Sequence, residues 1–176
     1  MEKWLSHWWG RDMVAGAIAA SAMALYMMIA MAISGLGFWT FPNVVAAVLP
    51  AFRPPSAGFE LVPTLLGLGI HLVGGAMLAL AYGVIAWAIA PAIARHYRPA
   101  LLTGSLYAAL IYVVQGRLFG PAVDPALTML PMGHYLIGHL IFGTVTTVLI
   151  TRNVRRREAR ITFAPKLPVE IPIERS

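Results

Sequence analysis

Four long stretches of this chain contain no charged side chain, and this feature restricts the possible folds more than any other. A hydrocarbon core about 30 Å thick is crossed by about 20 apolar residues of helix, and each stretch supplies most or all of that length. Of all residues, 59% are hydrophobic and 11% are charged. The sequence therefore predicts an all-α membrane protein, a bundle of four transmembrane helices. The uncharged stretches are Met13–Ile33, Leu61–Ala94, Pro99–Gly116 and Pro125–Thr151.

The residues that flank these stretches set the expected boundaries. Tryptophans before the first stretch are typical of a short segment in the headgroup layer, and prolines in the tail favour extended chain. We expect an interfacial segment at 1–11, a transmembrane domain at 12–151 and a basic, extended tail at 152–176. The expected spans are about 12–34, 62–91, 99–116 and 132–152.

Most of the positively charged residues lie at one end of the expected bundle. Of the 13 Lys and Arg residues, all but Arg53 and Arg117 lie before the first span, between the second and third, or after the fourth. By the positive-inside rule both termini are predicted to be cytoplasmic. The basic run from Arg152 to Arg160 is expected to contact anionic lipid headgroups. Because these positions explain the net charge of +6, we expect no nucleic-acid partner.

Two pairs of spans share a pattern of small residues spaced four apart. Such residues line one face of a helix and let a neighbouring backbone approach closely. A duplicated two-helix unit explains the pattern, and since each unit crosses twice, the predicted copies are parallel repeats. The matching stripes are His71, Gly75, Ala79, Gly83 with His139, Gly143, Thr147, Thr151, and Gly16, Ala20, Ala24 with Gly104, Ala108, Tyr112.

His71 and His139 are the main candidates for chemistry. Each lies about ten residues, or about 15 Å, into its helix at a rise of about 1.5 Å per residue. An ionisable side chain at this depth needs a partner. One interpretation is a hydrogen bond to a neighbouring helix, for instance to Tyr26, Tyr107, Tyr112 or Gln115. The other is a pair of axial ligands to haem b, with the neighbouring glycines admitting the porphyrin. Both stay open at this point.

A second polar group is expected near the outer end of the bundle. Tyr112, Gln115, Arg117 and His134 are predicted to form a structural cluster, with Arg117 paired to Asp124. A site for a quinone or a lipid headgroup there is the alternative. His134 and His139 are five residues apart and therefore point in different directions on a helix. We expect no metal site.

Catalytic signatures are missing from the sequence. The chain has no cysteine, no phosphate-binding glycine loop, no zinc-protease helix signature and no serine nucleophile elbow. No carboxylate lies in the middle of a span, which weakens a proton-coupled transporter. We do not expect an enzyme.

Short motifs from His71 onward occur together. They are His71 with Tyr82, Gly104-Ser105-Leu106, Gly138-His139-Leu140, and an arginine-rich flank leading to Ile161-Thr162. With these motifs the chain from His71 onward resembles the YagU-like family of uncharacterised bacterial inner-membrane proteins. The resemblance implies a four-helix inner-membrane protein, an association with acid resistance, and no established cofactor or reaction.

The expected function is that of a non-enzymatic accessory or scaffold protein, because the chain has little mass outside the membrane and no catalytic set. Its partners would be the lipid bilayer and the helices of a larger membrane complex. The alternatives are a haem-b-binding redox subunit of an electron-transfer complex, and a small solute- or proton-handling protein linked to acid resistance.

Overall fold

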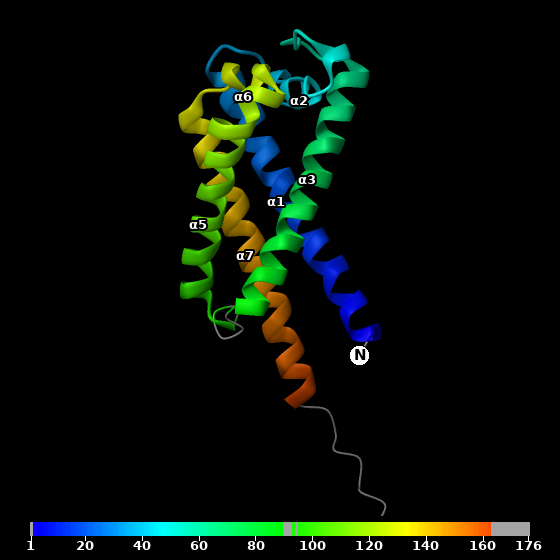
Figure 1. Ribbon diagram of the computed structural model, residues 1–176, viewed down its shortest axis with the longest axis vertical. Helices are drawn as coiled ribbons and strands as arrows, with labels where there is room; N and C mark the ends of the chain where they lie inside the picture. Colours follow the sequence, from blue (N-terminus) through cyan, green and yellow to red (C-terminus); the bar gives the residue numbers. More distant parts are fainter. Residues whose placement is uncertain (1, 90–92, 94, 163–176) are drawn as a thin grey trace, which may run out of the picture.

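The computed structural model describes residues 2–89, 93 and 95–162, and these form a bundle of long helices (Figure 1). The long helices are α1 (Glu2–Ile33), α3 (Leu61–Ile89), α5 (Tyr97–Val113) and α7 (Met132–Thr162). Within the described residues, 4 helices are long and apolar enough to cross a membrane. The predicted all-α, four-helix membrane bundle is therefore confirmed. The first residues of α1 and the last of α7 lie at one end of the bundle, which we call the terminal end (Figure 1).

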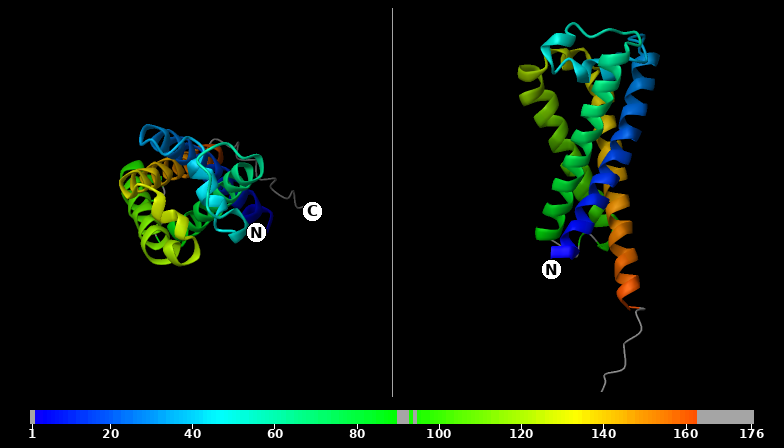
Figure 2. Two further views of the ribbon diagram at one scale, coloured as in Figure 1. Left: turned by 90° about the horizontal axis from the view of Figure 1, so that it is seen from above. Right: turned by 90° about the vertical axis from the view of Figure 1, so that its right-hand side faces the viewer.

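The helices pack in the order α3, α1, α7, α5 around a common axis (Figure 2). Close contacts join α1 to α3, α1 to α7, and α5 to α7, whereas α3 and α5 approach each other less closely. Two tyrosines bridge α3 and α5. The Tyr82 hydroxyl donates to the carbonyl of Ala100 at 3.2 Å, and the Tyr107 hydroxyl donates to the carbonyl of Leu78 at 2.8 Å.

Glycines bring the closest helices together. A Cβ atom on Gly75 would lie 2.5 Å from the Cβ of Ala20, and one on Gly143 would lie 2.5 Å from the carbonyl oxygen of Gly104. Real side chains do not approach so closely, so both crossings require glycine. The small-residue stripes face inward, as expected. The predicted repeat places these two crossings at equivalent positions.

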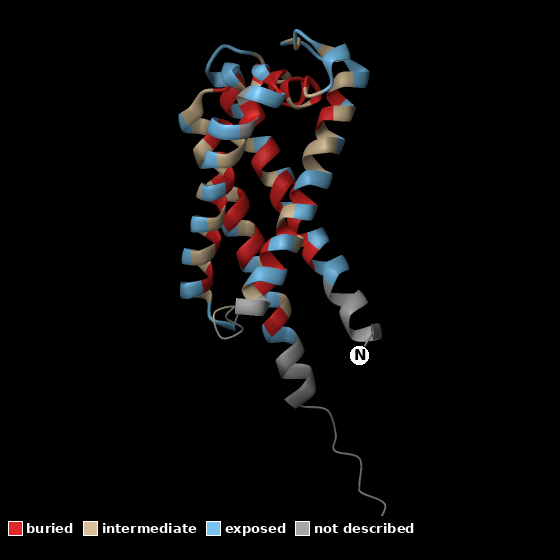
Figure 3. Ribbon diagram, in the orientation of Figure 1, coloured by how far each residue is buried: buried red, intermediate tan, exposed pale blue. Residues whose placement is uncertain are grey.

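The outward faces of the helices are apolar. On α5, Leu102, Leu106 and Leu110 form a stripe with exposed fractions of 63%, 62% and 59%. Exposed and buried residues alternate around each helix, and the buried faces meet at the axis (Figure 3). Because a water-soluble protein buries most of its leucines, these faces fit hydrocarbon or a partner helix.

Short helices cover the opposite end, which we call the cap end. They are α2 (Thr40–Ala46), η1 (Pro50–Phe52), α6 (Gly120–Val123) and η3 (Pro125–Met129). The chain leaves α1 at Gly35, whose φ of 74° only glycine adopts easily. The Leu36 N–H bonds to the Met31 carbonyl at 2.9 Å and the Gly35 N–H to the Ala32 carbonyl at 3.1 Å, a Schellman ending.

Asn43 ties the cap to the bundle. Its side-chain amide donates to the carbonyls of Ser56 at 2.9 Å and Gly58 at 2.8 Å, and its oxygen accepts from the Thr64 hydroxyl at 2.8 Å. Asn43 is 1% exposed, so these bonds replace water. Gly67 lets α3 lie directly against the backbone of Pro42.

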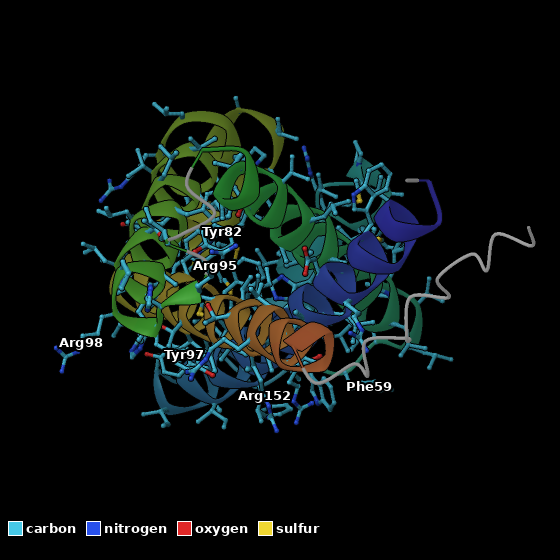
Figure 4. The ribbon with its side chains drawn as sticks, turned by 90° about the horizontal axis from the view of Figure 1, so that it is seen from below. Phe59, Tyr82, Arg95, Tyr97, Arg98 and Arg152 are labelled. Atoms are coloured by element: carbon cyan, nitrogen blue, oxygen red, sulfur yellow. The ribbon has the colours of Figure 1, made fainter. Side chains whose placement is uncertain are left out.

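At the terminal end the long helices run past two of the expected boundaries. Helix α1 runs without a break from Glu2, so residues 2–11 are helical and continuous with the first span, whose membrane-crossing part begins at Trp9. Helix α7 continues to Thr162, past the expected start of the tail at 152. Residues 163–176 lie outside the described part of the chain. Arg98 and Arg152 lie at this end, where Figure 4 shows Arg98 extending away from the helices.

Candidate functional site

A cavity of about 330 Å³ lies inside the bundle toward the cap end. Every long helix contributes to its wall, and α2 closes it from above. The lining is mostly apolar, with a few polar groups that converge on one space, which is the usual composition of a small-molecule site. The polar lining residues are His71, Gln115, Asp124, Tyr135 and His139.

His139 is held at the wall by two bonds. Its Nδ1 donates to the Tyr135 carbonyl, one turn back on α7, at 2.9 Å, and its Nε2 lies 3.2 Å from Oε1 of Gln115. The ring is 2% exposed and packs edge-on against the ring of Tyr135, with 4.4 Å between centroids. With Nδ1 protonated, a neutral imidazole keeps a lone pair on Nε2, and the Gln115 amide can turn to donate to it.

His71 is fixed differently. Its Nε2 donates to the carbonyl of Ala20 on α1 at 3.1 Å, and its ring meets the edge of Phe41 with centroids 5.1 Å apart. In the neutral ring this leaves Nδ1 as an acceptor. Both histidines therefore make interhelical or local hydrogen bonds, as the packing interpretation predicted. They also share one cavity, which that interpretation did not include.

A π-helical turn, η2 (Val114–Phe119), brings Gln115 to His139. Such a wide turn inserts an extra residue into a helix and is frequent at functional sites. Gly120 is required here because any side chain on it would collide with the Gln115 carbonyl. The glycines at 116 and 120 were the available sequence signal, but they do not by themselves indicate a π turn.

The predicted polar cluster does not form as one unit. Tyr112 and Gln115 do gather at His139, since the rings of Tyr112 and His139 are 6.1 Å apart. His134 instead bonds through Nδ1 to the Tyr26 hydroxyl at 2.9 Å, on the α1 side of the bundle. Arg117 is exposed and outside the cavity wall. These side chains project from different faces of their helices, so they do not meet.

The expected pairing of Arg117 with Asp124 is wrong. Arg53 is the cation beside Asp124, and its guanidinium donates to the carbonyl of Val123 at 2.8 Å and to that of Ala47 at 2.6 Å. The Asp124 carboxylate accepts from the Ala126 N–H at 3.1 Å. Arg53 and Asp124 lie in loops that are far apart in the sequence. The spacing of residues within one loop could therefore not predict this contact.

Asp124 makes stability depend on pH. Burial raises the pKa of its carboxyl above the ordinary 3.8, while the Ala126 N–H and the charge of Arg53 act in the opposite direction. A raised pKa means that the folded state binds the proton more tightly than the unfolded state. The resulting stabilisation is complete below the unfolded pKa and is lost as the pH rises through the folded pKa.

The Asp124→Asn variant tests this dependence. Asparagine retains an oxygen that accepts from the Ala126 N–H but does not titrate near neutral pH. We compare unfolding temperatures in detergent and take the value for Asp124→Asn minus the value for the unmodified protein. We expect this difference to increase as the pH rises from about 3.5 to 7, because only the unmodified protein loses stability over this range. A difference that stays constant over this range would contradict the pH dependence.

The glycines at 75 and 143 do not support the haem interpretation. The space beside Gly75 is filled by Ala20 and that beside Gly143 by Ala108 and the Gly104 backbone. These glycines serve helix contact and do not leave porphyrin-sized openings. Among the described residues, no three His, Cys, Asp or Glu side chains are grouped as they would be around a bare metal ion. Haem ligation by His71 and His139 stays a prediction, and a Soret band would test it.

The cavity reaches the surface beside Gly74. Gly74 and Val123 line the cavity and are exposed. Gly74 lies halfway along α3, and a Cβ atom on it would meet nothing within 4 Å. The exposed part of the lining therefore extends from Val123 at the cap end to Gly74 at mid-span depth, where the surroundings of such a helix are hydrocarbon.

No family model, curated protein or solved structure matches this chain. The resemblance to the YagU-like family therefore stays a prediction from the motifs, and the functional argument rests on the cavity.

Proposed function

We propose that this protein is a non-enzymatic accessory protein of a bacterial inner membrane, and that it binds a small lipid-soluble molecule within its bundle. The observation that carries the proposal is the cavity of about 330 Å³ with apolar walls and a few convergent polar groups. A closely packed scaffold needs no such space, since bundle interiors are normally filled by side chains.

The position of the opening supports a ligand that arrives from the membrane. Gly74 lies near the middle of a span, so a molecule passing it comes from hydrocarbon. The charge distribution supports an orientation with the terminal end in the cytoplasm, where Arg98 and Arg152 lie (Figure 4). Arg155 also lies there, with its guanidinium 5.2 Å from the Tyr97 ring centroid.

The accessory role is supported by the outward faces. In the outer stripe of α5 each leucine is more than half exposed, so the faces are available to lipid or to helices of a larger complex. The described polar groups of the cavity are engaged with backbone or with each other and include no nucleophile paired with a base.

A pair of glycine variants tests the binding function. In Gly74→Leu the new side chain occupies the opening of the cavity without a clash, because a Cβ at this position has free space. In the control, Gly69→Leu, the Cβ also has free space, but residue 69 lies on α3 outside the cavity wall. The two variants add the same apolar group to the same helix.

We expect one neutral lipid-soluble compound to be extracted, at about one molecule per chain, from the unmodified protein purified in mild detergent. Mass spectrometry of the organic extract should find it equally in Gly69→Leu and reduced at least about tenfold in Gly74→Leu, because a blocked opening removes the apolar contacts. Equal extracts from both variants would contradict the proposed function.

A further inference from the structure

The charges around the cavity restrict what it holds. No lysine or arginine is among the residues that line it, and the lining includes the carboxyl of Asp124. Arg53 lies beside Asp124 but outside the cavity wall, and its guanidinium donates to the carbonyls of Ala47, Val48 and Val123. A phosphate or carboxylate in the cavity would therefore have no cation in direct contact and would meet the carboxyl of Asp124. Burying such an unpaired charge is strongly unfavourable.

The hydrogen-bonding groups restrict the ligand further. The N–H of neutral His71 is used on the Ala20 carbonyl, which leaves its Nδ1 as a bare acceptor. In Asp124, Oδ1 accepts from the Ala126 N–H and the second oxygen has acceptor capacity left. The Gln115 amide supplies both a carbonyl and an N–H₂ group. A hydroxyl matches this set, because it donates to an acceptor and accepts from an amide.

The walls favour a ring. Phe41 and Phe142 line the cavity together with the rings of Tyr135, His71 and His139, and Met23 adds a polarizable sulfur. Aromatic edges and thioethers pack well against an aromatic ligand. The acceptors stand on different elements, His71 on α3 and Asp124 between α6 and η3, so a ligand with hydroxyls on two sides of a ring engages both.

We propose that the cavity binds a neutral phenolic lipid of the hydroquinone class, with its hydroxyls hydrogen-bonded to His71 and to the group formed by Gln115, His139 and Asp124. This inference rests on the proposed binding function and names its ligand class. The apolar tail of the ligand leaves past Gly74 into the bilayer.

Three synthetic probes with the same decyl tail test the inference: decylhydroquinone, its dimethyl ether, and decyl phosphate. Each is added at increasing concentration to the purified full-length protein in detergent, and the apparent Kd is taken from the rise in unfolding temperature. We expect decylhydroquinone to bind about 5- to 150-fold more tightly than the ether, since two buried hydrogen bonds of about 0.5 to 1.5 kcal/mol each separate them. Decyl phosphate should give no saturable rise.

Two variants locate the effect. His71→Phe keeps an aromatic ring and removes one acceptor, so one hydrogen bond remains. We expect the preference for hydroquinone over its ether to fall to about 2- to 13-fold, near the square root of the preference in the unmodified protein. Gly74→Leu should weaken the binding of both ring probes, and Gly69→Leu should leave both unchanged. If His71→Phe fails to fold, the comparison of the three probes on the unmodified protein still tests the ligand class.

Equal affinities for the hydroquinone and its ether, both lost in Gly74→Leu, would overturn the ligand class and leave the binding function standing. Tighter binding of decyl phosphate would likewise overturn the class, because it would require a cation in the cavity. The absence of saturable binding by all three probes, with equal extracts from the glycine variants, would overturn both proposals.

Discussion

A Gly75→Leu variant is expected to lose the native bundle, whereas Gly74→Leu, one residue earlier, is expected to retain it. At Gly75 a Cβ would lie 2.5 Å from the Cβ of Ala20 and 3.3 Å from the carbonyl of Gly16, so any side chain forces α1 and α3 apart. At Gly74 the same atom meets open space. Overpacking costs about 1 to 3 kcal/mol at an adaptable site and more where backbone faces backbone.

We expect the unfolding temperature of Gly75→Leu to fall by about 10 °C or more, or the protein to leave a sizing column as aggregate. Gly74→Leu should unfold within about 2 °C of the unmodified protein, since the leucine also favours helix over glycine. The pair controls for hydrophobicity, position and helix propensity. Similar behaviour of the two variants would show that the glycine crossing does not hold α1 against α3.

Asn43→Ala is expected to release the cap from the bundle. The substitution leaves the buried hydroxyl of Thr64 without its acceptor, and the half-buried carbonyl of Ser56 and the exposed one of Gly58 without their donor. A buried polar group left unpaired costs about 1 to 3 kcal/mol and each lost hydrogen bond about 0.5 to 1.5 kcal/mol, so we expect a loss of about 2 to 3 kcal/mol, concentrated at the cap end. Faster proteolysis between residues 47 and 60 in lipid nanodiscs would detect it.

Thr64→Val provides the graded control for the cap. It removes the Thr64 hydroxyl, which donates to Asn43 and accepts from the Glu60 N–H at 3.3 Å, but leaves the two carbonyl bonds of Asn43 in place. We expect a loss of about 1 kcal/mol and slower proteolysis than in Asn43→Ala. If both variants are cleaved at the same rate, the cap is held by apolar contacts of Phe41 and Val44 and not by Asn43.

The helices and their inward faces were predictable because they depend on local pattern. Charge is excluded from the hydrocarbon, and glycine is needed wherever two backbones touch, so the spans and the stripes at Gly75 and Gly143 could be read directly. The hydrogen-bonding role of the histidines followed from the same reasoning, and Gln115 was among the partners considered for them.

The cavity could not be predicted, because it depends on a contact that does not form. Gly138 lets α7 approach α1, where a Cβ would lie 3.2 Å from the sulfur of Met27 and 3.3 Å from Met23. The predicted repeat puts Ile70 of α3 and Ile111 of α5 at the positions of Gly138 and Met23, and both line the cavity. The volume of Ile70 fits the wider spacing of α3 and α5, but its effect needs the tertiary arrangement.

The cap was beyond sequence reasoning for a related reason. Asn43 finds its partners 13 and 15 residues away in an irregular loop, and Arg53 reaches Val123 across 70 residues. Neither helical periodicity nor turn chemistry encodes such distant pairs. Arg117 and His134 were expected near Gln115 at the outer end of the bundle, but Arg117 points outward and His134 points to Tyr26, and depth alone does not predict which face a side chain leaves.

Tyr107 of α5 is hydrogen-bonded to the Leu78 carbonyl of α3, below the cavity. At the cap end Arg53, in the loop after η1, is hydrogen-bonded to the carbonyl of Val123 at the end of α6. From Ile70 to Leu78 the helix rises only about 12 Å, at about 1.5 Å per residue. Under the proposed binding function, a ligand that enters beside Gly74 passes above the Tyr107 link. We therefore expect a ring compound with one chain to enter more readily than a phospholipid with two.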